Sequence, residues 1–381
     1  MLIIDSLHIG GAENAVALIA RGLHRERFDV AVRCTASLGV IAEQLLADGI
    51  DVALSGAPTR RQRYFTPWYL HRAIKDWGAD VVHSHGTPSL LHLGPLAALG
   101  ATPPWVHTFH YGNYPLPNRK EMLGERVFVR EASQLVAVAE VQRQSIIRCH
   151  RINPNAIVTV VNGVDASRVV GPDVREARRA EFGFTPAHIV VGCVAVLTRQ
   201  KGITYLLQAA RELVDRDPRI RFLVAGGGPL EAALRQEAID LGLGDRVVFT
   251  GWRQDNFELL SALDVFVMSS LWEAMPLALL EAMSASRPIV VTDVGDNRMV
   301  VGDGEAGIVI PPADPPAIVS AVLQHIGDPD GARAMAERAR QRFLQRFTTE
   351  QMVRRYEDIY ERVASGARTP SLHGYAAGAV Q

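Results

Sequence analysis

Short apolar runs alternate with amphipathic segments along the chain. Seven runs in the first half have the length and composition of β-strands: Leu2–Asp5, Val30–Cys34, Val52–Leu54, Val81–His83, Trp105–His107, Gln134–Val138 and Ile157–Val161. Between them, segments such as Gly11–Leu23 and Gly39–Asp48 place apolar residues three or four positions apart, as one face of a helix does. Strands that alternate with helices predict a parallel sheet covered on both faces.

The alternation restarts at Ile189–Val196, a near-continuous apolar run typical of a buried parallel strand. Further strands are expected at Arg221–Ala225, Val247–Phe249, Val265–Met268, Ile289–Thr292 and Gly307–Ile310. Helices are expected at Ile203–Asp215, Pro229–Leu241, Asn256–Leu263, Pro276–Ser284, Pro315–Phe347 and Thr349–Ala364. The sequence therefore predicts the α/β fold class, with two doubly wound parallel-sheet domains of similar size.

Two further stretches are predicted to contain a linker or a loop. The Arg-rich stretch Ala166–Pro186 is expected to be a linker that leads into the first helix of the second domain. The stretch Val81–Asn118 contains no Asp, Glu, Lys or Arg but is broken by Pro and Gly, so we expect strand, loop, strand rather than a membrane span. In open α/β sheets ligands bind beyond the carboxyl ends of the strands, so the chemistry is expected in the loops there.

Composition excludes several classes of protein. Apolar residues make up 48% and charged residues 21%, which is ordinary for a soluble globular protein. A formal net charge of −1 argues against a nucleic-acid partner. The three cysteines lie far apart, which argues against a disulfide framework and fits a reducing compartment. Leu2–Ile4 is too short for a signal peptide, and a true start upstream of Met1 is expected because the first strand begins abruptly.

Glycines and histidines follow strands of the first half. Gly10 and Gly11 expose backbone N–H groups at a helix start, which suits an anion, although a plain tight turn is equally consistent. His110 follows its strand and is placed to donate to a substrate oxygen, whereas His107 is expected to be structural. His83 and His85 form a His-x-His pair without a nearby acidic ligand, so no metal site is predicted.

Three loops of the second half suit a phosphate-containing ligand. Arg199 and Lys201 lie in the first loop and have the charge to hold a diphosphate, with a solvated basic turn as the alternative. The run Gly226–Pro229 permits close ligand approach. Glu273 precedes a helix opened by Pro276, and Glu281 lies within it. Two carboxylates at such a helix start can bind the hydroxyls of a sugar and of a ribose on either side of a phosphate. The alternative is a pair of exposed glutamates without a ligand, which is common.

Together these motifs resemble the family 4 retaining glycosyltransferases of GT-B fold. The motifs are GGAE at Gly10–Glu13, NGVD at Asn162–Asp165, RQKG at Arg199–Gly202, GGGP at Gly226–Pro229 and the two glutamates Glu273 and Glu281. The resemblance extends from Met1 to about Ala364 and is not specific to one substrate. It implies two Rossmann-like domains that face each other across a cleft. Residues 1–168 plus 349–365 would bind the acceptor, residues 169–348 the nucleotide-sugar donor, and residues 366–381 would form a disordered tail.

The resemblance also implies roles for single residues. His110 and Glu273 would be catalytic and contact the sugar, Lys201 would hold the diphosphate, Glu281 would bind the ribose, and Gly11 would approach the diphosphate. The complete set of implied donor-binding residues is Gly11, Arg199, Lys201, Gly226, Gly228, Trp252, Arg253, Met275, Pro276, Leu277 and Glu281. The implied acceptor-binding residues are Gly10, Glu13 and His85.

The implied reaction moves a hexosyl or N-acetylhexosaminyl group, with retention, from a nucleotide sugar to a hydroxyl acceptor. UDP is the expected nucleotide, the acceptor is a sugar or a lipid-linked group of bacterial polysaccharide or glycolipid synthesis, and neither cofactor nor metal is expected. Some positions depart from the family pattern: Val196 replaces an Arg, and Met299 stands where Glu is frequent. A non-catalytic nucleotide-sugar-binding relative is therefore the alternative, whereas the absence of GxGxxG argues against a dehydrogenase.

A basic and aromatic segment, Arg60–Trp68, bears on location. Contact with anionic lipid headgroups or stacking on a sugar acceptor is one interpretation. A solvated loop with packed aromatics is favoured over both. The protein is expected in the cytoplasm. Peripheral association with the inner face of the cell membrane is the alternative location.

Overall fold

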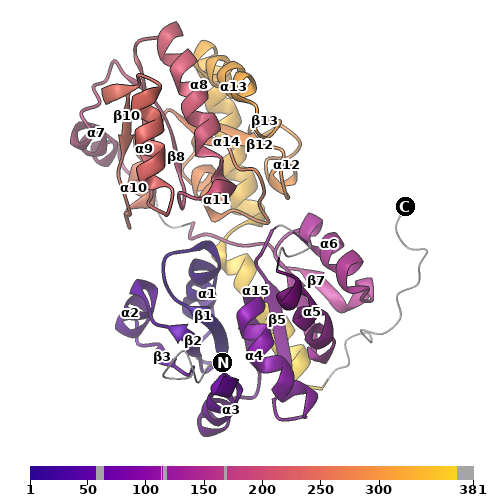
Figure 1. The fold of residues 1–381 in the computed structure, drawn as a ribbon. Coiled ribbons are helices and arrows are strands. Elements are labelled where there is room, and N and C mark those ends of the chain that lie inside the picture. The colour runs from indigo at the N-terminus through magenta and orange to yellow at the C-terminus, as the bar shows by residue number, and fades with distance from the viewer. Residues whose placement is uncertain (57–63, 113, 115–117, 167–169, 367–381) are drawn as a thin grey trace. The chain divides into compact units, whose positions relative to one another are not determined.

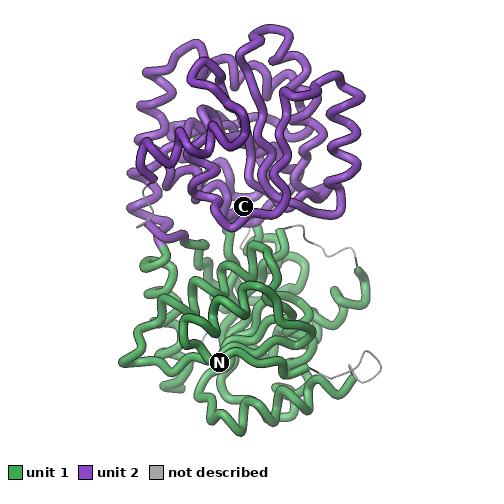
Figure 2. Tube along the Cα trace, turned by 90° about the vertical axis from the view of Figure 1, so that its left-hand side faces the viewer, with its two compact units in different colours: residues 1–163, 349–381 green, residues 164–348 purple. Residues whose placement is uncertain are grey.

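The chain forms two compact units (Figures 1 and 2) in a computed structural model that describes residues 1–56, 64–112, 114, 118–166 and 170–366. Unit 1 contains Met1–Gly163 together with the chain from Thr349 onward, and unit 2 contains Val164–Thr348. Of the predicted tail, only Gly366 lies within the described residues.

Unit 1 is built on a seven-stranded parallel sheet in the order β3-β2-β1-β4-β5-β6-β7. Its strands are β1 Leu2–Ser6, β2 Ala31–Ser37, β3 Asp51–Leu54, β4 Val82–His85, β5 Trp105–Phe109, β6 Gln134–Ala137 and β7 Ile157–Thr159. Its α-helices are α1 Gly11–Gly22, α2 Val40–Ala47, α3 Thr66–Trp77, α4 Gly86–Ala98, α5 Arg119–Phe128, α6 Glu140–His150 and α15 Thr349–Ala364.

Apolar side chains pack on both faces of this sheet. One cluster includes residues of α1, α2 and α15, and the other includes residues of α3, α4 and α6. Burial on both faces explains why apolar residues occupy successive positions in a strand such as β1, with the sequence LIIDS. Helix α15 belongs to this first unit, because it packs so closely on α1 that a Cβ on Gly22 would lie 2.6 Å from Val353 Cγ2.

Unit 2 has a six-stranded parallel sheet in the order β10-β9-β8-β11-β12-β13. Its strands are β8 Ile189–Val194, β9 Ile220–Ala225, β10 Val247–Phe249, β11 Val265–Met268, β12 Ile289–Thr292 and β13 Ile308–Ile310. Its α-helices are α7 Pro172–Glu181, α8 Ile203–Arg216, α9 Glu231–Asp240, α10 Asn256–Ala262, α11 Leu277–Ser284, α12 Asn297–Val300, α13 Pro315–Gly327 and α14 Pro329–Arg346.

Three predicted stretches are wrong: Val81–Asn118, Pro315–Phe347 and, as described below, the linker Ala166–Pro186. The stretch Val81–Asn118 contains helix α4 instead of only a loop, and Pro95 lies inside that helix, where sequence rules disfavour it. Its neighbour Gly94 packs against Phe128, with an added Cβ only 2.2 Å from the ring, so tertiary packing offsets the weak helix propensity. The predicted helix Pro315–Phe347 is two helices, because Asp328 caps a new helix by accepting from the N–H of Gly331 at 3.0 Å.

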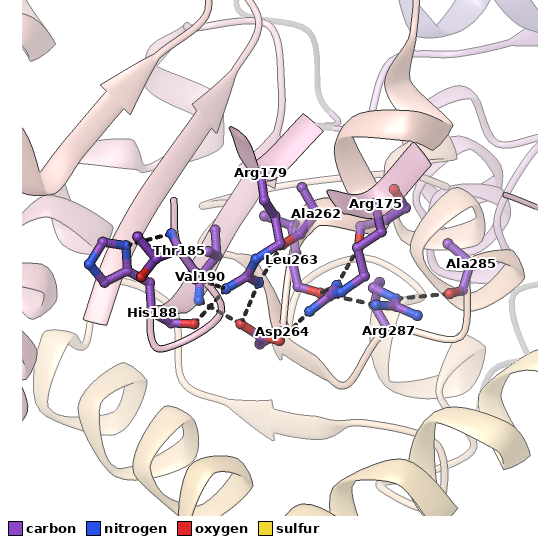
Figure 3. Close-up of polar contacts among 11 residues, drawn as sticks. Arg175, Arg179, Thr185, His188, Val190, Ala262, Leu263, Asp264, Ala285 and Arg287 are labelled. Atoms are coloured by element: carbon purple, nitrogen blue, oxygen red, sulfur yellow. Dashed lines mark hydrogen bonds and ion pairs between the residues drawn. The ribbon is translucent and has the colours of Figure 1, made fainter. Parts of the chain in front are cut away.

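An arginine cluster attaches α7 to the sheet of unit 2 (Figure 3). Arg175 donates to Asp264 Oδ1 at 2.5 Å, and Arg179 donates to Asp264 Oδ2 at 3.0 Å. The same Oδ2 accepts from the backbone N–H of Val190 at the start of β8, at 2.7 Å. The guanidinium groups also donate to backbone carbonyls, such as that of Leu263. The Arg-rich stretch predicted as a linker therefore contains a helix that is fixed by buried and half-buried ion pairs.

Candidate functional site

The first strand of each unit lies in the interior of its sheet. In unit 2, β8 lies between β9 and β11, and in unit 1, β1 lies between β2 and β4. At such a position the strand order reverses, so the chain connections of the two neighbouring strands run to opposite faces of the sheet. Ligands of open α/β sheets bind there, at the carboxyl ends of the strands. Of the predicted site residues, Gly10 and Gly11 follow β1, and Arg199 and Lys201 follow β8.

Lys201 and Glu273 meet beside β8 and β11 in unit 2. Lys201 ends the short 3-10 turn Arg199–Lys201 after β8, and Glu273 lies in the loop between β11 and α11. Lys201 Nζ donates to Glu273 Oε1 at 2.5 Å, and Glu273 is only 6% exposed. The structure thus brings together two of the predicted site residues, although 72 positions separate them in the chain.

Two side chains that the sequence analysis missed also hold this carboxylate. Ser270 Oγ donates to Glu273 Oε1 at 2.8 Å, and Gln200 Nε2 donates to Oε2 at 3.1 Å. Gln200 donates further to the carbonyl of Trp272 at 2.9 Å. Both oxygens of Glu273 are therefore engaged, so its orientation is fixed. The only sequence signal for these two residues is their place in the same two loops.

The glycines after β9 are required by the fold itself. Gly226 has a φ of +118°, and a Cβ there would lie 2.0 Å from the carbonyl oxygen of Ala195. A Cβ on Gly228 would lie 2.6 Å from the carbonyl oxygen of Leu197. The loops after β8 and β9 therefore pack backbone against backbone. Close packing of the two loops accounts for these glycines without a ligand, so their donor-binding role stays a prediction.

The predicted donor-binding residues around these loops differ in exposure and in hydrogen bonding. Arg199 is exposed, and its guanidinium makes no hydrogen bond to another described residue. Trp252 is 47% exposed. Arg253 is engaged, because it donates to both oxygens of Asp255 and to Glu181 Oε1 at 2.7–2.8 Å. These bonds, above all those to Asp255, raise the pKa of Arg253 above its usual range.

Helix α11 begins four residues after Glu273. Its N-terminal boundary is Pro276, and Leu277 is its first residue. Met275 and Pro276 are buried, whereas Leu277 and Glu281 are half-buried. The first N–H groups of a helix have no acceptor within it, and the helix dipole places positive charge there. This start therefore suits an anion.

The glycine pair of unit 1 opens α1. Gly10 is the N-terminal boundary residue, and the carboxyl group of Glu13 folds back so closely that a Cβ on Gly10 would lie 2.2 Å from Glu13 Oε2. Burial raises the pKa of Glu13. A Cβ on Gly11 would meet no atom within 4 Å. The described fold therefore does not require glycine at position 11.

Three of the predicted histidines are buried, and a fourth is half-buried. His83 and His85 lie on β4, and His107 lies on β5, with its Nδ1 2.7 Å from Ser84 Oγ. His110 follows β5 and is half-buried, with its Nε2 3.0 Å from Nδ1 of His85. Burial lowers the pKa of His107 to about 3 and that of His110 to about 4.

No group of three or more His, Cys, Asp or Glu side chains among the described residues is arranged to hold a metal ion. In the part of the chain that the structure describes, every helix is too short or too polar to cross a bilayer.

Comparison with known proteins gives matches over both units. The model of glycosyl transferases group 1 matches residues 174–342, and that of Glycosyltransferase Family 4 matches residues 9–168. The chain is 28% identical to the UDP-Gal:alpha-D-GlcNAc-diphosphoundecaprenol alpha-1,3-galactosyltransferase of Escherichia coli, over 76% of this chain and 77% of that protein. It is 30% identical to the D-inositol 3-phosphate glycosyltransferase of Saccharomonospora viridis, over 77% and 72%.

Among solved structures, the crystal structure of Anabaena Alr3699/HepE in complex with UDP-glucose is similar, with a TM-score of 0.86. The match covers 94% of this chain and 98% of the Anabaena chain, at 21% sequence identity. The two parallel-sheet units define the GT-B fold class. Within that class, the chain belongs to the group 1 glycosyltransferases, which are also family 4. The predicted family and fold class are confirmed.

Replacing Gly11 by Ala separates the fold from ligand binding at α1. Because the added Cβ has open space and Ala favours helix, we expect the free energy of unfolding in urea to stay constant or rise by about 0.5–1 kcal/mol. If a ligand approaches this backbone, the same variant lowers kcat/KM for sugar transfer at least tenfold. Gly327→Ala, at the last residue of α13, where a Cβ is equally unobstructed, is the control and should leave kcat/KM unchanged. An unchanged kcat/KM in Gly11→Ala would show that no ligand needs glycine there.

Proposed function

We propose that this chain transfers a hexosyl or N-acetylhexosaminyl group from a UDP-sugar to a hydroxyl acceptor, with retention of the anomeric configuration. The proposed acceptor is a sugar or a lipid-linked group of bacterial polysaccharide or glycolipid synthesis. The relatives support this proposal, because the E. coli protein is named for UDP-Gal and a diphosphoundecaprenol-linked GlcNAc. The Anabaena structure holds UDP-glucose.

The pair of Lys201 and Glu273 is the observation that carries the proposal. The ammonium group has three N–H donors and uses one on Glu273, so two remain for a diphosphate. The start of α11 adds the positive end of a helix dipole. Both groups stabilise a leaving diphosphate most strongly when its charge is greatest, which accelerates departure of the sugar. Because side chains and backbone dipoles take up this charge, the proposed reaction needs no cofactor.

The hydrogen bonds that occupy Glu273 support a mechanism without a carboxylate nucleophile. In it, the acceptor attacks the anomeric carbon from the same face from which the diphosphate leaves. Retention by double displacement needs a free carboxylate nucleophile, with two carboxyl groups about 5 Å apart. Glu273 accepts from Lys201 and Ser270 at one oxygen and from Gln200 at the other. Such a carboxylate is suited to orient sugar hydroxyls rather than to attack the anomeric carbon.

The alternative function is nucleotide-sugar binding without transfer. Val196 stands where the family usually has an Arg beside the diphosphate, which removes one cation. The exposed side chain of Arg199 lies three residues further along the same loop and has no ion pair with another described residue. We propose that Arg199 replaces the missing cation, which favours the active enzyme.

Two substitutions in the pair test the function. Lys201→Ala removes a donor to the leaving group, and Glu273→Gln removes the carboxylate, so each is expected to lower kcat by about 10²–10³-fold. The measurement is release of UDP from a panel of UDP-sugars with chromatographic detection of the glycosylated acceptor. Arg333→Ala is the control, because this side chain of unit 2 is 78% exposed and lies on α14; kcat should stay constant.

An unchanged kcat in both Lys201→Ala and Glu273→Gln would contradict the proposed function. Thermal stabilisation of the wild-type protein by UDP without transfer to any acceptor would favour the non-catalytic alternative.

We further propose peripheral contact with the anionic inner face of the cytoplasmic membrane. Of the predicted segment Arg60–Trp68, residues 60–63 lie outside the described residues, but Tyr64, Phe65 and Trp68 are 92%, 62% and 56% exposed. These side chains lie at the start of α3. Trp and Tyr side chains with one apolar and one polar part suit the level of the lipid headgroups.

Helix α5 supplies a second exposed surface of the same character. Its exposed residues recur at helical spacing and form a basic and apolar face: Arg119, Lys120, Leu123, Arg126 and Val127. The three cations of this face form no ion pair with another described residue. In chain order, α3 follows β3 and α5 follows β5. Anionic lipid complements this charge, at about 1 kcal/mol per cation.

Vesicle sedimentation tests the membrane contact. The wild-type protein is expected to sediment with vesicles that contain phosphatidylglycerol and not with vesicles of phosphatidylcholine alone. The double variant Leu123→Ser and Val127→Ser loses two apolar side chains, each worth about 1.5–3 kcal/mol when fully buried, so its partition should fall at least tenfold. Ile239→Ser, at a residue of unit 2 that is 64% exposed, is the control. Equal sedimentation of the double variant and the wild type would rule out this surface.

A further inference from the structure

Two histidines at the ends of neighbouring strands share one hydrogen bond in unit 1. His85 ends β4 and is 2% exposed, whereas His110 follows β5 and is half-buried. The distance between His85 Nδ1 and His110 Nε2 is 3.0 Å, and the two rings are stacked at 28°. His85 was predicted to bind the acceptor, but its burial leaves it little surface for a ligand. Its contact with His110 indicates that it acts through that residue.

The ring of His85 is held in turn by His83. The centroids of these two rings lie 3.9 Å apart. The nitrogens of His83 lie 2.6 Å from the hydroxyl of Tyr360 and 2.7 Å from that of Thr108, so the plane of His83 is fixed from both sides. Tyr360 belongs to α15, the last helix within residues 170–366. The orientation of the His85 ring therefore depends on contacts that span unit 1.

Both rings of the pair are neutral near pH 7. Burial lowers the pKa of His85 well below its usual range and that of His110 to about 4. Each neutral ring carries one proton, so one nitrogen of each ring is a donor and the other is an acceptor. The hydrogen bond between them therefore has two alternative arrangements.

The second nitrogen of His85 distinguishes these arrangements. If His110 donated from Nε2, the proton of His85 would lie on its own Nε2, which is buried and has no partner among the described residues. Buried N–H groups without an acceptor are rare, because desolvation of the donor is not offset. In the other arrangement, His85 Nδ1 donates to His110 Nε2. His85 Nε2 then carries no proton, so only an acceptor lone pair is left without a partner.

We propose that His85 is a positioning residue that holds His110 in the tautomer with its proton on Nδ1. The Nε2 atom of His110 is then occupied as an acceptor. Its Nδ1–H makes no bond to another described residue, and it is the polar group that this partly exposed ring offers to a ligand. His110 in this state donates a hydrogen bond to an oxygen and does not take a proton at Nδ1. The catalytic part rests on the proposed function, in which His110 contacts the transferred sugar.

Nitrogen-15 NMR of histidine-labelled protein at pH 7.5 tests the tautomer without any substrate. The signal of His110 is assigned by its loss in His110→Gln. We expect a protonated Nδ1 and an unprotonated Nε2 in the wild type. His85→Phe keeps an aromatic ring but removes the donor, so His110 is expected to shift toward the Nε2–H form. His85→Asn places an amide N–H close to the position of Nδ1 and should keep the wild-type tautomer.

Transfer kinetics of the same variants test the consequence. We expect His85→Phe to lower kcat/KM by about 10–100-fold and His85→Asn to remain within about threefold of the wild type. A proton on Nε2 of His110 in the wild type, or an unchanged tautomer in His85→Phe, overturns the proposal. If the tautomers behave as expected but no UDP-sugar is turned over, the proposed function fails and the positioning role of His85 remains.

Discussion

The parallel strand order, with the first strand inside each sheet, is the constraint on which the candidate site depends. Because all strands of each sheet are parallel, their carboxyl ends lie at one edge, where the loops after β8 and β11 in unit 2 and those after β4 and β5 in unit 1 are neighbours. Lys201 and Glu273 meet for this reason, and so do His85 and His110. Neither pair contains residues that are close in sequence.

The second requirement is that the polar groups gathered there are held by hydrogen bonds. A buried carboxylate or imidazole is costly unless it has partners, and each partner also restricts its orientation. Glu273 receives three donors from the loops after β8 and β11. The ring of His85 is held by His83, which depends on the hydroxyls of Thr108 and Tyr360. Groups of this kind are oriented before any ligand arrives, which is the condition for electrostatic stabilisation of a transition state.

Much of the fold follows from periodicity, because the strands are buried on both faces and the helices are amphipathic. The exceptions have physical causes. Helix α4 has Gly94 and Pro95 in its interior, and its packing on Phe128 is invisible to a local pattern. The break at Asp328 is a side-chain cap within a long run of helix-forming residues.

The site shows the same division between local and tertiary information. The loops that carry chemistry were predictable, since they follow strands, and Lys201 and Glu273 were named from them. Ser270 and Gln200 were not, because their role exists only where two distant loops meet. His85 was predicted to follow its strand, which was expected to end at His83, whereas β4 extends to His85 and the side chain is buried.

The central claim is that a nucleoside diphosphate binds at the carboxyl ends of β8 and β11. Hydrogen–deuterium exchange of the wild-type protein with and without saturating UDP tests it most directly. We expect slower exchange in peptides covering residues 195–202 and 269–281 and no change in a peptide covering 315–327, and we expect NAD to produce no such effect. Unchanged exchange in the first two peptides, or protection by UDP confined to other segments, would contradict it.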